Sequence, residues 1–226
     1  MHDQPTPPSP PDELAHSALV LVDIQPDFMP GGALPVADGD AIVAGVNDLL
    51  DRGGFPHIVA TQDWHPLGHA SFASRHPSRA PFEVITLHGH DQVLWPDHCV
   101  QGTAGAALHD GLHLNRVDLI IRKGSNPAVD SYSAFRNNWN ESGERPPTGL
   151  AGHLRELDVT DVYLCGLARD VCVKWTAEDA VNLGFGAAVI WDLTRPVDPA
   201  TDDEVRAELH ARGVRVIHAA ELGELE

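Results

Sequence analysis

The hydrophobic positions of this chain fall into short runs that turn-forming residues separate. Most runs are rich in branched side chains, and their length is typical of buried β-strands. We expect strands at Ala18–Asp23, His57–Gln62, Asp118–Lys123, Asp161–Gly166, Gly186–Asp192 and Val214–His218.

Helical patterns occupy several intervals between these strands. They span Asp38–Arg52, Gly149–Leu157, Asp170–Leu183 and Thr201–Arg212. Asp38 and Asp170 are candidate N-caps, as are Thr148 and Thr201, and Thr201 precedes Glu204 by a capping-box spacing. Strands that are apolar throughout and alternate with helices predict an α/β fold. We expect three α-β-α layers around a six-stranded, mostly parallel sheet.

Length and composition suit a single globular domain, since the chain has 226 residues of which 42% are hydrophobic. We expect this domain to cover residues 17–226, behind a disordered, proline-rich tail over residues 1–16. The N-terminal residues lack the basic start and apolar stretch of a signal peptide, and no apolar run is long enough to span a bilayer.

The charge balance narrows the possible partners. There are 15 Lys and Arg residues against 33 Asp and Glu, a net charge of −18, which repels nucleic-acid backbones and anionic membranes. Cys99, Cys165 and Cys172 are too few for a disulfide framework, so we expect a cytoplasmic protein. A small-molecule substrate is the expected partner, and a homo-oligomer is left open.

Several reactive side chains stand where predicted strands end. Ligands of an open parallel sheet bind outside the carboxyl ends of its strands. Asp23, Asp63 and Lys123 end the first three strands, and Cys172 follows the fourth. Two long stretches without periodicity begin at the same edge, and such stretches are usually functional: Asp63–Thr103 and Gly124–Pro147.

Cys172 stands at the start of a predicted helix, where backbone N–H groups and the helix dipole favour a thiolate. A lone cysteine there is more often a small buried hydrophobe. Asp23 can serve as its base and Lys123 as its cation, whereas the alternative is a structural Asp–Lys ion pair. Three such residues at matched strand ends favour catalysis. Cys165 is expected in the core, and Cys99 is a weaker candidate for a reactive thiol or metal ligand.

A second cluster has the composition of a metal site. Asp63 and His65 are two residues apart in an extended segment, and His98 can join them from the following loop. One carboxylate and two imidazoles leave coordination positions open for water and a ligand. His69 is a possible fourth ligand or a supporting residue. Because the chain holds 14 His, spacing alone leaves the metal site open.

Together, the motifs of this chain resemble those of the nicotinamidases, within the isochorismatase-like hydrolase superfamily. The matching segments are Leu21-Val-Asp-Ile-Gln-Pro-Asp-Phe28, Thr61-Gln-Asp-Trp-His-Pro66, His69-Ala-Ser-Phe72, Trp95-Pro-Asp-His-Cys-Val-Gln-Gly-Thr103, Lys123-Gly124, Asp130-Ser-Tyr-Ser-Ala-Phe135 and Gly166-Leu-Ala-Arg-Asp-Val-Cys172. They run in family order across nearly the whole chain after the tail. The segments with Asp63 and His98 are the most specific, because many superfamily members lack a metal.

The resemblance implies an isochorismatase-like, Rossmann-like hydrolase fold and assigns roles to the residues above. Asp23, Lys123 and Cys172 would form a catalytic triad. The metal ligands for one divalent zinc, iron or manganese ion would be Asp63, His65 and His98. A cis peptide would precede Ala168, whose N–H would form an oxyanion hole with that of Cys172.

By the same resemblance, Phe28 and Trp95 would flank a pyridine ring and Tyr132 would line the pocket. The implied reaction is hydrolysis of nicotinamide to nicotinate and ammonia through a Cys172 thioester, serving NAD salvage, and pyrazinamide should fit as well. Arg169 and Val171 depart from the commoner family pattern, which leaves the range of substrates open.

Two alternative functions remain at this point. An amidase for another small amide, such as a carbamoyl or ureido compound, would keep the triad, but the metal motif argues against it. A catalytically silent binding module would keep the pocket, but it would have no need of an intact Asp–Lys–Cys set.

Overall fold

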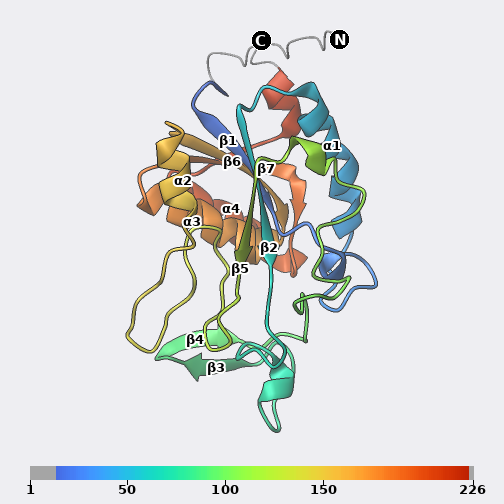
Figure 1. Ribbon diagram of the computed structural model, residues 1–226, viewed down its shortest axis with the longest axis vertical. Helices are drawn as coiled ribbons and strands as arrows, with labels where there is room; N and C mark the ends of the chain where they lie inside the picture. Colours follow the sequence, from blue (N-terminus) through green and yellow to red (C-terminus); the bar gives the residue numbers. More distant parts are fainter. Residues whose placement is uncertain (1–13, 224–226) are drawn as a thin grey trace.

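The computed structural model describes residues 14–223 as an α/β protein built on one central sheet (Figure 1). The sheet has six strands in the order β5-β2-β1-β6-β7-β8, and each neighbouring pair is parallel, as the sequence predicts. The strands are β1 (Ser17–Val22), β2 (His57–Asp63), β5 (Leu119–Lys123), β6 (Asp161–Leu167), β7 (Gly186–Arg195) and β8 (Arg215–Ile217).

Helices cover both faces of the sheet, with α1 on one side and α2 and α3 on the other (Figure 1). Their bounds are α1 (Ile42–Arg52), α2 (Leu150–Glu156), α3 (Lys174–Asn182) and α4 (Asp202–Ala211). The buried face of α1 carries Ile42, Val46, Leu49 and Leu50, which are spaced as one stripe of a helix. Every residue of β1 is buried, as expected for a strand that lies inside the sheet with both faces covered.

The helix starts differ from the predicted caps. Asp38 has a left-handed backbone with a φ of 53°, and a 3-10 turn separates it from α1. Asp170 lies inside a π-helical turn, Arg169–Val173, that precedes α3, and its carboxylate accepts hydrogen bonds from a distant loop. The hydroxyl of Thr201 donates to a backbone carbonyl instead of capping α4. Thr148 comes nearest to the prediction, since the N–H of Leu150 donates to its hydroxyl at 3.3 Å.

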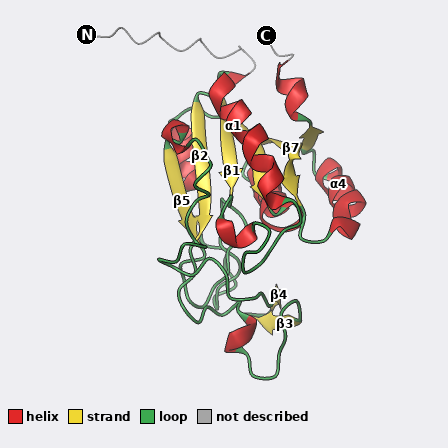
Figure 2. Ribbon diagram, turned by 90° about the vertical axis from the view of Figure 1, so that its right-hand side faces the viewer, coloured by secondary structure: helices red, strands yellow, loops and turns green. Residues whose placement is uncertain are grey.

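The two stretches without periodicity lie beyond the carboxyl ends of the strands (Figure 2). The first contains an antiparallel hairpin that the sequence did not predict, made of β3 (Val84–Leu87) and β4 (His90–Val93). Most hairpin residues are exposed or half-buried, so the hairpin lacks the apolar alternation that reveals a strand. The second stretch forms loops that close over the same edge of the sheet.

Residues 1–13 of the predicted tail lie outside the described residues. Leu14 is already buried in the core, and its carbonyl accepts a hydrogen bond from the Ser17 hydroxyl at 2.7 Å, so the folded part begins before residue 17. Among the helices of residues 14–223, none is long and apolar enough to cross a membrane.

Candidate active site

Asp23 lies directly after β1 and is fully buried. The hydroxyl of Thr61, on the neighbouring strand β2, donates to Asp23 Oδ1 at 2.6 Å, and the backbone N–H of Asp23 donates to the same hydroxyl oxygen. Burial raises the pKa of Asp23, while the nearby Lys123 acts in the opposite direction, and the net shift is upward. Asp23 is therefore a stronger base, once ionised, than an exposed carboxylate.

Lys123 ends β5 in register with Asp63 on β2, which brings the two side chains together. Its ammonium contacts Asp63 Oδ1, lies 2.8 Å from Asp23 Oδ2 and 2.8 Å from the Ser131 carbonyl oxygen. Burial alone would lower the pKa of Lys123, but the two carboxylates raise it well above its ordinary value. Lys123 is thus a permanent cation in the centre of the site, and its Nζ lies 3.6 Å from Cys172 Sγ.

Cys172 lies in the π-helical turn after β6 and is 6% exposed. Its sulfur and carboxylate oxygens of Asp23 and Asp63 lie within 4.8 Å of one another. Burial raises the pKa of Cys172 well above 9.0, although Lys123 lowers it. Burial thus opposes the thiolate that the helix start was expected to favour, while the charge of Lys123 supports it. The resting thiol needs an adjacent base.

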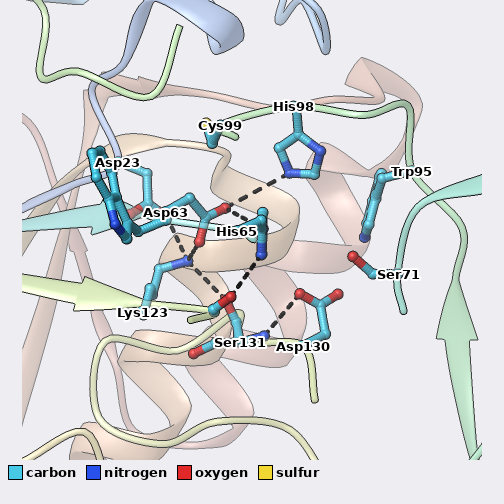
Figure 3. Close-up of polar contacts among 12 residues, drawn as sticks. Asp23, Asp63, His65, Ser71, Trp95, His98, Cys99, Lys123, Asp130 and Ser131 are labelled. Carbon is cyan, nitrogen blue, oxygen red and sulfur yellow. Dashed lines mark hydrogen bonds and ion pairs between the residues drawn. The ribbon is translucent and has the colours of Figure 1, made fainter. Parts of the chain in front are cut away.

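His65 and His98 converge on Asp63, beside this cluster (Figure 3). Asp63 Oδ2 lies 3.6 Å from His65 Nε2 and 3.8 Å from His98 Nε2, and all three residues are buried. The pKa of Asp63 is well below its ordinary value. Burial acts to raise this pKa, but Lys123 and His65 together lower it by more than burial raises it. Asp63 thus belongs to both clusters, with one oxygen toward Lys123 and the other toward the imidazoles.

The donor set fits a divalent metal ion. Nδ1 of His65 lies 3.0 Å from the Gly124 carbonyl oxygen, and Nδ1 of His98 lies 2.7 Å from the Pro96 carbonyl oxygen. A carbonyl can only accept, so each Nδ1 carries a hydrogen, and in the neutral imidazole that a metal ion requires, each Nε2 lone pair would lie on the side of Asp63. Two imidazole nitrogens and one carboxylate oxygen are typical ligands of zinc and of other transition metals.

His69 supports this cluster from outside. Its Nδ1 lies 2.8 Å from the Ser71 hydroxyl, its Nε2 lies 2.9 Å from the Asn126 carbonyl oxygen, and its ring packs 4.4 Å from that of His65. Both nitrogens are thus engaged away from Asp63. Cys99 is fully buried and burial raises its pKa well above the ordinary value, so it is a poor nucleophile. Cys165 lies in the core, as expected.

A cavity opens onto both clusters. Its lining includes Asp63, His98 and Cys172, together with four residues that the resemblance placed near the substrate: Phe28, Trp95, Tyr132 and Ala168. The peptide bond between Leu167 and Ala168 is cis, which confirms that expectation. Val171, which departs from the family pattern, also lines the cavity, and sequence reasoning gave no role to the remaining lining residues, which are Leu34, Asp130 and Val197.

A buried network behind the cavity was also missed. Gln92, on the unpredicted strand β4, donates from Nε2 to the Tyr132 hydroxyl at 2.8 Å and to Asp130 Oδ2 at 2.7 Å. The indole N–H of Trp95 donates to the same hydroxyl at 3.2 Å. Gln92 therefore holds Tyr132 directly and is connected to Trp95 through the same hydroxyl. A buried glutamine on an otherwise exposed hairpin leaves no periodic pattern in the sequence.

The fold and the site together define a class: α/β proteins with a six-stranded parallel sheet and a buried Cys–Lys–Asp cluster beside a potential metal site. Residues 17–221 match the family described as Isochorismatase domain, and the chain belongs to that family. The chain is 49% identical over 181 residues to a nicotinamidase from Acinetobacter baylyi, covering 80% of this chain and 82% of that protein. It is 43% identical to a nicotinamidase from Escherichia coli, covering 92% and 98%.

Solved structures agree with this assignment. A nicotinamidase and pyrazinamidase from Acinetobacter baumanii is 44% identical, with a TM-score of 0.86 over 92% of this chain and 98% of that one. The L. infantum protein PnC1, solved with nicotinate, is 41% identical, with a TM-score of 0.79 over 90% and 93%. A Pyrococcus horikoshii pyrazinamidase solved with zinc is 35% identical, with a TM-score of 0.68 over 90% and 99%.

Proposed function

We propose that this protein is a metal-dependent amidase that hydrolyses nicotinamide to nicotinate and ammonia in NAD salvage. The observation that carries the proposal is the position of Asp63. Its two oxygens join the Asp23–Lys123–Cys172 cluster to the His65–His98 pair, and both clusters face one cavity. A nucleophile and a site for a ring ligand are thus a few ångströms apart. The nicotinamidase relatives supply the substrate class.

The first half of the reaction acylates Cys172. Asp23 takes the thiol proton as the sulfur attacks the carboxamide carbon, and Lys123 stabilises the negative charge on the sulfur. The oxyanion forms next to the backbone N–H groups of Ala168 and Cys172, each worth about 3 kcal/mol by analogy with other enzymes. Protonated Asp23 then gives its proton to the departing nitrogen. Ammonia leaves, and a thioester remains.

The second half regenerates the enzyme. A water molecule gives a proton to Asp23 while its oxygen attacks the thioester carbon, and the C–S bond breaks. The proton on Asp23 returns to the sulfur, the new carboxyl group loses its remaining proton to solvent, and nicotinate is released. The raised pKa of Asp23 suits this alternation between base and acid, because a group that both takes and returns a proton works best when its pKa is near the working pH.

Asp63, His65 and His98 would hold the divalent ion, which we take to be zinc, iron or manganese. When bound, the ion supplies a ligand position for the pyridine nitrogen and so orients the ring. Phe28 and Trp95 face the cavity and would flank the ring on its apolar faces. Pyrazinamide carries a ring nitrogen at the same place and should be accepted. The three free thiols suit a reducing cytoplasm, where we place the protein.

The test is ammonia release from nicotinamide by the purified protein, before and after treatment with a chelator. We expect hydrolysis that the chelator abolishes and that zinc, iron or manganese restores. Benzamide, which lacks the ring nitrogen, should be a far poorer substrate. Equal turnover of benzamide and nicotinamide would reject the role of the ion in orienting the ring. Turnover of a carbamoyl or ureido compound in preference to nicotinamide would reject the substrate.

A further inference from the structure

Arg169 is a buried cation that directly follows the cis Leu167–Ala168 peptide and stands three residues before Cys172. Its side chain is 5% exposed, and all of its N–H groups are directed to acceptors. Nε donates to Thr194 Oγ1 at 2.8 Å, Nη1 donates to both carboxylate oxygens of Asp202 at 2.7 Å, and Nη2 donates to the carbonyl oxygens of Trp191 and Thr194. The guanidinium carbon also lies 3.9 Å from the ring centroid of Trp191.

These contacts hold the guanidinium in one orientation. A planar group with five satisfied donors and a stacked face cannot turn without breaking several hydrogen bonds at once. The acceptors belong to the end of β7 and the start of α4, whereas Arg169 belongs to the turn that carries Cys172. These bonds therefore join the nucleophile turn to the neighbouring strand β7 and to the start of α4.

The next residue strengthens the same connection. The carboxylate of Asp170 accepts hydrogen bonds from the backbone N–H groups of Val197 at 2.8 Å and Asp198 at 2.9 Å. Val197 and Val171 both line the cavity. Arg169 thus joins the nucleophile turn to β7 and α4, and Asp170 joins the same turn to the cavity wall at Val197.

We propose that Arg169 is a positioning residue for the amidase reaction, which holds the Cys172 sulfur and the adjacent backbone N–H groups in the geometry for attack. The proposal rests on the proposed function. Displacing a reacting group by about 1 Å can lower the rate 100-fold, and Arg169 supplies the side-chain hydrogen bonds that join the turn at Arg169–Val173 to Thr194 and Asp202. Loss of Arg169 should lower kcat rather than raise KM, because the residues proposed to flank the ring and to hold the metal lie on other segments of the chain.

The experiment compares Arg169→Ala, Arg169→Lys and Asp202→Asn with a matched control, Lys174→Met. Lys174 donates from Nζ to Glu208 at 2.8 Å and joins the start of α3 to α4, so its substitution removes an ion pair beside the turn and leaves the side-chain bonds of Arg169 and Asp170 in place. We expect kcat for nicotinamide to fall about 100-fold in Arg169→Ala and about tenfold in Arg169→Lys and Asp202→Asn. KM and bound metal should stay within about threefold of the parent values, and Lys174→Met should match the parent.

A second readout does not depend on turnover. Alkylation of each cysteine by iodoacetamide is followed by mass spectrometry, and Cys99 and Cys165, which are buried like Cys172, act as internal controls. Release of the turn should speed alkylation of Cys172 at least tenfold in the Arg169 variants, while Cys99 and Cys165 stay slow. Faster alkylation of all three thiols, or a kcat in every variant within threefold of Lys174→Met, would overturn the proposal.

The two readouts separate this proposal from the proposed function. If the parent protein does not hydrolyse nicotinamide, the proposed function fails, while the alkylation rates still report whether Arg169 holds the turn. If Arg169→Ala does not fold, Arg169→Lys and Asp202→Asn, which keep the buried volume, carry the comparison. Unchanged kcat and unchanged Cys172 alkylation in both would reject the positioning role.

Discussion

Lys123 and Asp63 are paired across β5 and β2, and their contact joins the two halves of the site. The register of the strands places the two residues side by side at the carboxyl edge of the sheet. Lys123 fixes one carboxylate oxygen of Asp63 and leaves the other free to face His65 and His98. The geometry proposed for metal binding and the geometry proposed for catalysis therefore depend on the same ion pair.

Replacing Asp63 should disturb both halves at once. In Asp63→Asn, the carboxylate is lost as a metal donor and Lys123 keeps only Asp23 as a carboxylate partner. We expect metal affinity to fall more than about 100-fold and the metal-free protein to lose roughly 1–3 kcal/mol of stability. Metal titration and chemical unfolding in chelator would measure the two effects.

His98→Asn is the matched control for this variant. It removes an imidazole donor but leaves the Lys123 ion pair intact, so it should lower metal affinity with a smaller loss of stability in chelator. Equal stability of the two metal-free variants would show that the ion pair contributes little to the fold. Parental metal affinity in Asp63→Asn would remove Asp63 from the donor set.

Cys172→Ala should abolish turnover without changing the rest of the site. We expect the rate of ammonia release to fall at least about 10³-fold, because both halves of the reaction pass through the sulfur. The side chain is small, so the variant should fold and retain its metal, which circular dichroism and metal analysis would check. Substantial remaining hydrolysis would mean that the sulfur is not the nucleophile.

The pattern of apolar runs in the sequence was sufficient to predict the parallel sheet and the strand ends that carry the site. Asp23, Asp63 and Lys123 each follow an apolar run, and the rule for parallel sheets brings such positions to one edge. This part was predictable because it depends on local periodicity and on topology. The resemblance added the roles, and the cis peptide before Ala168 agrees with it.

Features that depend on packing could not be predicted. The pKa of Cys172 depends on burial and on charges from other strands, which a helix-start argument does not contain. Gln92 acts through a hairpin whose side chains are mostly exposed, and its partners Asp130 and Tyr132 lie about 40 residues further along the chain. Asp170 has the residue type of an N-cap, but its carboxylate binds the loop at Val197 instead.

The pH dependence of turnover should report the burial of Asp23. Burial raises its pKa above 3.8, and the charge of Lys123 and the Thr61 hydrogen bond lower it again, with a net upward shift. As the pH falls, Asp23 binds a proton and can no longer accept one from Cys172. The kcat/KM profile should therefore lose activity on the acid side with a midpoint above pH 3.8, measured with saturating metal so that histidine protonation does not release the ion.

Thr61→Val tests the assignment of this midpoint. It removes the hydroxyl that donates to Asp23 Oδ1 and keeps the shape of the side chain. The ionised carboxylate loses a stabilising hydrogen bond, so the acid midpoint should move to higher pH. Because Asp23, Asp63 and Lys123 interact strongly, the midpoint belongs to the group as a whole. A midpoint that stays in place would assign the acid limb to another residue.

Gln92→Leu should weaken substrate binding more than catalysis. The change removes the amide that donates to Tyr132 and Asp130, so the aromatic wall of the cavity loses its fixed orientation while Asp23, Lys123 and Cys172 keep theirs. We expect KM for nicotinamide to rise about tenfold, equivalent to about 1.4 kcal/mol, with kcat within about threefold of the parent. Gln101→Leu, which removes a glutamine bond from the exposed Trp64 carbonyl, is the matched control.

Tyr132→Phe combined with Gln92→Leu should raise KM by less than the product of the single effects, because both changes break the same hydrogen bond. Independent, multiplying effects would place Gln92 outside the network that shapes the cavity.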